Sequence, residues 1–89
     1  MWIRAAEAAL GALLEQQEQL LGPDDHEILE TVDLLGMMFL HEGDDARART
    51  HFQRALEGST RMLGAEHEFT NAYRESLQDS IGGIDGKLK

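Results

Sequence analysis

Four histidines and a surplus of carboxylates could bind a metal ion in this 89-residue chain. His26 and Glu30 have the i, i+4 spacing that shares one helix face, and His41 and His51 flank a predicted turn. A zinc site needs three or four converging ligands, and the chain has neither HExxH nor another paired histidine spacing. We therefore predict no metal site, with His26 and His67 in linkers and the other two at helix surfaces.

Catalytic chemistry has no better support. The absence of cysteine excludes disulfides, thiolate metal sites and a cysteine nucleophile. Ser59, Ser76 and Ser80 lack the GxSxG setting of a serine nucleophile, and no glycine-rich phosphate loop precedes a helix. The acidic pairs Asp24-Asp25 and Asp44-Asp45 are explained as helix caps. The sequence thus predicts no catalytic residue, no cofactor and no enzymatic activity.

The net charge limits the classes of binding partner that the sequence predicts. The net charge is −9, whereas nucleic acids and anionic membranes are bound by clustered Lys and Arg, so neither is expected as a partner. No apolar run approaches the ~20 residues that span a bilayer, and the N-terminus lacks a signal-peptide core, so we expect a cytoplasmic protein. Between Gly22 and Gly43 there are six acids and no Lys or Arg. This segment forms either a solvated acidic face or an acidic partner surface.

An internal repeat organises the chain. Leu20-Leu21-Gly22-Pro23-Asp24 recurs 42 residues later as Met62-Leu63-Gly64-Ala65-Glu66. The same offset preserves apolar character at six further pairs: Ala6 and Ala48, Leu10 and Phe52, Leu13 and Ala55, Leu14 and Leu56, Leu35 and Leu77, Phe39 and Ile81. Such a register indicates one supersecondary unit used more than once.

Apolar spacing predicts four helices within this period, over residues 3–21, 26–41, 46–63 and 68–81. Gly22 and Gly64 are expected to end helices with positive φ, and Gly82-Gly83 to end the fourth helix and leave a flexible tail at 82–89. Links of about two to five residues make neighbouring helices antiparallel. The predicted fold class is all-α, an antiparallel α-hairpin stack of about four helices.

The run from Leu34 to Leu40 is apolar almost all round, which predicts core packing on more than one side rather than a cofactor or lipid surface. Gly36 lies inside this run. Because glycine costs ~1 kcal/mol relative to alanine within a helix, it indicates a close approach by a neighbouring helix. Ala48 and Ala55 offer a matching small surface.

Seven residues of the second and third predicted helices resemble the tetratricopeptide repeat (TPR) signature of paired helices A and B: Val32, Leu35, Gly36, Phe39, Ala48, Phe52 and Ala55. The 42-residue period resembles the kinesin-light-chain variety rather than the commoner form of about 34 residues. The linker of that variety reads Leu-Gly-Pro-Asp-His-Pro, and this chain has Leu-Gly-Pro-Asp-Asp-His at residues 21–26 and Leu-Gly-Ala-Glu-His-Glu at residues 63–68. The resemblance implies a TPR-like α-solenoid fragment over residues 1–81. Its parts would be helix B of an incomplete repeat (3–21), a full repeat (26–63) and a degenerate or capping helix (68–81), in which Arg74 and Gln78 replace Val32 and Gly36.

The resemblance implies a protein–protein interaction scaffold, with the A helices lining a concave groove. Carried over by position, the groove face comprises Glu30, Asp33, Met37, His41, Ala72, Glu75 and Asp79. Many relatives carry an Asn pair in the middle of helix A, and one Asn often holds the backbone of a bound peptide. This chain has Asp33-Leu34 there, so it lacks that Asn clamp. An acidic, methionine-containing groove would favour a basic protein segment or peptide.

Self-association is the alternative function. About one and a half repeats and a cap fall short of the ~3 repeats usually needed for stability. The chain is therefore either a fragment of a longer array or a structural module that completes its own stack. Trp2, Ile3 and Ala9 have no later partner in the chain, and pairing two such faces about a two-fold axis predicts a homodimer.

Overall fold

The computed structural model describes the backbone of residues 2–88 and the side chains of residues 4–80. It consists of the helices α1 (Trp2–Leu20), α2 (His26–His41), α3 (Asp45–Leu63) and α4 (Glu68–Leu88), with no strand in the described part of the chain. The all-α prediction of about four helices is confirmed. The helices α2 and α4 begin at His26 and Glu68, which are separated by the 42 residues of the sequence period.

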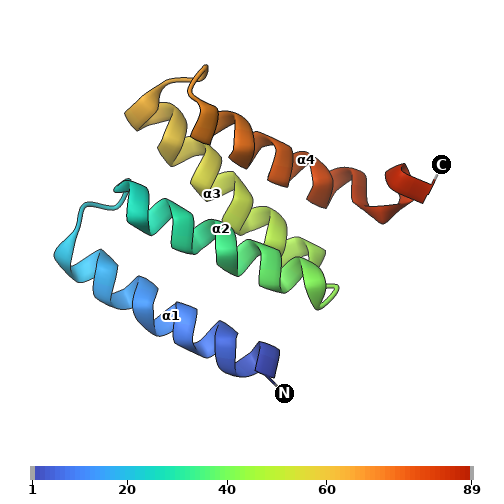
Figure 1. Cartoon of the computed structure of the whole chain (residues 1–89), viewed down its shortest axis with the longest axis horizontal. Coiled ribbons are helices and arrows are strands. Elements are labelled where there is room, and N and C mark those ends of the chain that lie inside the picture. The colour runs from blue at the N-terminus through green and yellow to red at the C-terminus, as the bar shows by residue number, and fades with distance from the viewer. Residues whose placement is uncertain (1, 89) are drawn as a thin grey trace.

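The helices form a flat, antiparallel stack with overall dimensions of 43 × 37 × 17 Å (Figure 1). The helices α2 and α3 make the centre, α1 packs on α2 at one edge, and α4 packs on α3 at the other (Figure 1). The helix α4 also contacts α2, whereas α1 lies away from α4. The stack therefore has a face to which both α2 and α4 contribute.

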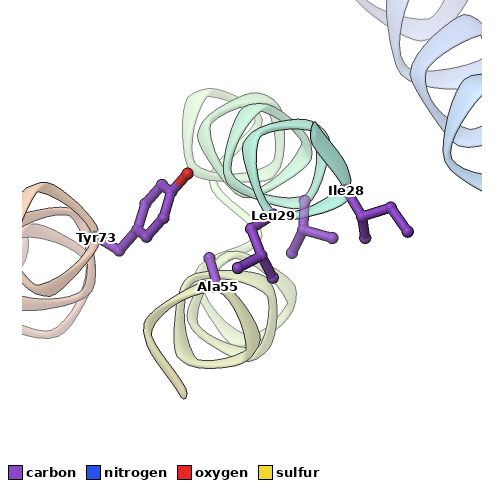
Figure 2. Close-up of a cluster of buried hydrophobic side chains, with 5 residues drawn as sticks. Ile28, Leu29, Ala55 and Tyr73 are labelled. Atoms are coloured by element: carbon purple, nitrogen blue, oxygen red, sulfur yellow. The ribbon is translucent and has the colours of Figure 1, made fainter. Parts of the chain in front are cut away.

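The core is made by two clusters of buried apolar side chains that bridge these contacts. The first contains Ile28, Leu29, Val32, Ala55 and Tyr73. Figure 2 shows Tyr73 reaching from α4 toward α2, and Leu29 and Ala55 meeting between α2 and α3. The second contains Leu35, Phe39, Ala48 and Phe52, with Leu10, Leu14, Leu40 and Leu77 packed around it. Together the clusters draw on all four helices.

The apolar run in α2 is covered on two sides, by α1 and α3, as its composition predicts. Leu35, Gly36 and Phe39 are buried there. A third side stays open, because Leu34 and Met37 are each 48% exposed. This open apolar side borders the face shared by α2 and α4.

Aspartates start the two central helices, as expected for N-caps. The Asp25 carboxylate accepts a hydrogen bond from the Glu27 amide (2.9 Å), and the Asp44 carboxylate accepts one from the Arg47 amide (3.1 Å). Asp24 has another role. Its two carboxylate oxygens accept hydrogen bonds of 2.9 and 3.0 Å from the Arg61 guanidinium, which lower the pKa of Asp24. This ion pair joins the first linker to the end of α3.

The two linker glycines differ in conformation. Gly64 has φ of +95°, as predicted, but Gly22 does not have positive φ, so that part of the prediction is wrong. The reason is Pro23, because proline restricts the residue before it to extended conformations. The ψ of Gly64 is 159°, which places this residue in a region that is essentially limited to glycine.

Gly64→Ala is expected to destabilise the chain by about 1–3 kcal/mol, since alanine must adopt a strained backbone there. Gly22→Ala is the matched control, because a Cβ at Gly22 meets no atom within 4 Å. It should change the free energy of unfolding by less than about 0.5 kcal/mol. Urea unfolding followed by circular dichroism measures both, and equal effects would contradict the assignment of strain to Gly64.

The backbone of α4 continues to Leu88, whereas the sequence predicted a helix end at Ile81. A glycine costs about 1 kcal/mol in a helix but removes no backbone donor, so Gly82-Gly83 does not impose the break that proline would. The predicted flexible tail at 82–89 falls on residues whose side chains lie outside the described part of the chain, and residue 89 lies wholly outside it.

Candidate functional site: a pocket between α2 and α4

A pocket of about 320 Å³ opens between α2 and α4. Its α2 wall is made by Glu30, Asp33 and Leu34, and its α4 wall by Phe69, Ala72 and Tyr73. Both triplets have the spacing i, i+3, i+4, which brings side chains onto one helix face. The pocket therefore lies between one face of α2 and one face of α4.

Aromatic packing fixes the α4 wall. Tyr73 is 5% exposed and belongs to the first core cluster (Figure 2). Phe69 is more open, but its ring stacks on His26 at the start of α2, with centroids 4.3 Å apart and an interplanar angle of 15°. His67 contacts the same ring from the linker, at 4.9 Å between centroids. These contacts hold the first turns of α2 and α4 together.

Buried hydroxyls position α4 on α3. The Thr70 hydroxyl donates to the Gly64 carbonyl at 2.8 Å, and the Ser59 and Thr70 oxygens are 2.6 Å apart. Since the Thr70 proton is used by the carbonyl, Ser59 donates to Thr70. Both side chains are fully buried. Ser59 is thus a structural residue that sets where the α4 wall lies.

The pocket contains two acidic side chains, Glu30 and Asp33. Burial raises the pKa of Asp33, and the Ser76 hydroxyl on α4 partly opposes that shift. The Asp33 Oδ1 atom has no hydrogen-bond partner within the described residues. Burial, together with the charges of Asp33 and Glu30, raises the pKa of Tyr73 to about 12, so this phenol stays neutral at physiological pH. Glu30 is exposed and lies 3.5 Å from the His26 Nε2 atom.

Asp33→Asn is expected to stabilise the chain at neutral pH. A raised carboxyl pKa means that folding disfavours the ionised form of Asp33. The stability that this carboxyl group contributes is therefore present below its pKa in the unfolded chain, and it is lost as pH rises through its pKa in the folded chain. The variant should melt a few degrees higher than the wild type at pH 7, with the difference shrinking toward pH 3.

Asp79→Asn provides the control for that measurement, because it removes one negative charge from an exposed position of α4. Thermal melts of the three proteins between pH 3 and pH 7 separate burial from net charge. Equal stabilisation by the two variants at pH 7 would contradict a specific burial cost at Asp33.

The structure brings three of the seven predicted groove residues together, because Glu30, Asp33 and Ala72 line the pocket. The other four lie on the surface outside it and are exposed: Met37, His41, Glu75 and Asp79. Binding of a partner at these seven residues stays a prediction.

Leu34, Phe69 and Tyr73 complete the pocket and were not predicted as site residues. The repeat alignment did not identify the two aromatic residues, since the 42-residue offset matches Phe69 to Glu27 and Tyr73 to Thr31. The i, i+3, i+4 spacing shared by the two walls is the signal that could have identified them.

The predicted oligomer interface is described only in part. The side chains of Trp2 and Ile3 lie outside the described residues, and Ala9 is exposed on α1. On the same helix Leu13 is 42% exposed and Leu20 is 83% exposed. The α1 edge of the stack therefore presents apolar side chains to solvent.

Within the described residues, no three His, Asp or Glu side chains are grouped so that they could hold a metal ion. Among the described helices, none has the length and hydrophobicity of a membrane-spanning segment. Comparisons of the chain with protein-family models, with curated proteins and with solved structures give no match.

Proposed function

We propose that this chain is a protein-interaction module of the kinesin-light-chain-like TPR type that binds a basic segment of a partner protein on its α2–α4 face. The observation that carries the proposal is the pocket, in which the carboxylates of Glu30 and Asp33 stand beside apolar walls. Basic side chains suit such a site because they combine an apolar stem with a charged head. A cytoplasmic location remains part of this proposal.

Two further features support a basic partner. Leu34 in the pocket wall and Met37 beside the pocket are each half exposed and offer apolar contact area. The net charge of −9 favours encounters with positively charged segments. Exposed ion pairs contribute only about 0–1 kcal/mol each, whereas burying a large apolar side chain contributes about 1.5–3 kcal/mol. The charges should therefore set selectivity and association rate, and the apolar walls should add affinity through the stem of the same side chain.

Fluorescence anisotropy with labelled peptides tests the proposal. We expect an alternating Lys-Ala peptide to bind and an alternating Glu-Ala peptide not to bind, with affinity falling as ionic strength rises from about 50 to 300 mM. Glu30→Lys should weaken binding at least about tenfold. Glu15→Lys makes the same charge change at an exposed position of α1 and should leave affinity within about twofold. Equal losses in both variants, or no binding of the basic peptide, would overturn the proposal.

Self-association stays a second candidate function, favoured by the exposed Leu13 and Leu20 on α1. A second copy of the chain would cover these side chains. Sedimentation equilibrium at about 100 μM, far above a micromolar dissociation constant, should then show a homodimer that Leu13→Glu converts to a monomer. A monomeric wild type would remove this candidate.

A further inference from the structure

We infer that the α2–α4 pocket receives a single lysine side chain, with its methylene stem along Leu34 and Phe69 and its ammonium group beside Asp33 and Glu30. The inference rests on the proposed function and specifies which basic group the site selects. It turns on three properties of the pocket: its size, its walls and the state of its carboxylates.

The size of the pocket limits its occupant. A volume of about 320 Å³ is at the lower end of the range of about 300–1,000 Å³ for ligand sites. It accommodates one long side chain, whereas the rest of a peptide would lie on the surface across Met37 and the exposed acids of α4. One residue of the partner is therefore the anchor.

The walls match an aliphatic stem. Leu34 is 48% exposed and Phe69 is 38% exposed, so both have apolar surface left to bury. Tyr73 lies deeper and is held in the core, so its ring is a fixed part of the pocket. Lysine buries its methylenes on such surfaces and keeps the ammonium group at the polar end.

The carboxylates favour an ammonium over a guanidinium group. The Asp33 Oδ1 atom is buried and lacks a partner within the described residues, so a ligand can reach at most the other oxygen of this carboxyl group. One accessible oxygen cannot give arginine the bidentate pairing that its planar fork prefers. Glu30 stands three residues away on the same helix face, and an ammonium group with three donors can serve both carboxylates.

The test uses four synthetic peptides that are identical and uncharged except at one central position. That position holds lysine, arginine, Nε-acetyl-lysine or norleucine, and nuclear magnetic resonance follows the Leu34 methyl groups and the Phe69 and Tyr73 rings. We expect the lysine peptide to shift these signals. Acetyl-lysine and norleucine should bind at least about tenfold more weakly, and arginine at least about threefold more weakly.

Two variants locate the effect. Asp33→Asn should abolish the preference for lysine over norleucine, and Leu34→Ser, at an exposed position, should weaken binding of both peptides. Glu15→Gln, at an exposed position of α1 outside the binding face, should keep the preference. If the alternating Lys-Ala peptide binds but the lysine and acetyl-lysine peptides bind equally well, the pocket inference is wrong while the proposed function stands. If neither the lysine peptide nor the alternating Lys-Ala peptide binds, the pocket inference and the proposed function both fail.

Discussion

Phe52→Ala is expected to lower the free energy of unfolding by about 3–5 kcal/mol. Phe52 is 1% exposed and belongs to the cluster in which side chains from all four helices meet. Removing its ring leaves a cavity that the surrounding helices can close only in part. Because small domains are stable by only about 5–15 kcal/mol, much of this margin would be lost. Urea unfolding followed by circular dichroism measures the effect.

Met62→Ala is the control for that substitution, since Met62 lies on the same helix and is 61% exposed. It should change the free energy of unfolding by no more than about 0.5 kcal/mol. A loss below about 1 kcal/mol for Phe52→Ala would show that the four helices do not converge on this ring.

Gly36→Leu is the second substitution with a large expected cost, at or above the upper end of the roughly 1–3 kcal/mol typical of overpacking. A Cβ at Gly36 would lie 2.7 Å from the Phe52 Cε1 atom and 2.8 Å from its Cδ1 atom. The ring is enclosed by Leu35, Phe39 and Ala48, so it cannot move aside cheaply. Even Gly36→Ala should destabilise, although alanine gains about 1 kcal/mol in helix propensity.

A double-mutant cycle identifies the cause. Phe52→Leu shortens the side chain that meets the new Cβ, so Gly36→Ala should cost less in the Phe52→Leu background, with a coupling of about 0.5–3 kcal/mol. Gly11→Ala in α1 is the matched control, because a Cβ there meets no atom within 4 Å. It should stabilise by up to about 1 kcal/mol. If Gly36→Ala stabilises to the same extent, the close approach is wrong.

Helix positions could be predicted because they depend on local signals. The caps Asp25 and Asp44 begin helices where their spacing to the following apolar residues requires. Gly36 could be interpreted because a glycine inside an apolar helix lowers stability unless a neighbouring side chain occupies the space of its missing Cβ. Gly22 shows the limit of such reasoning, since two signals competed there and Pro23 determined the backbone conformation.

The pocket could not be predicted to the same extent, because its shape depends on how α4 docks on its neighbours. That docking is set by the Ser59–Thr70 hydrogen bond and the His26–Phe69 stack. Each joins residues from different helices, and of these residues only Phe69 belongs to an apolar periodicity that reveals a helix. Positional transfer from the repeat therefore found the acidic side chains but missed the aromatic wall.

The one-sided packing of α1 has a consequence for motion. No side chain described in α1 is fully buried, and the helix packs on α2, with one ion pair from Glu18 to Arg54 of α3. Regions with few buried contacts open locally at a small fraction of the global unfolding free energy. The amide hydrogens of α1 would exchange with solvent well before those of the α2–α3 hairpin. Since the pocket is built from α2 and α4, a ligand there would slow amide hydrogen exchange in those two helices and leave exchange in α1 unchanged.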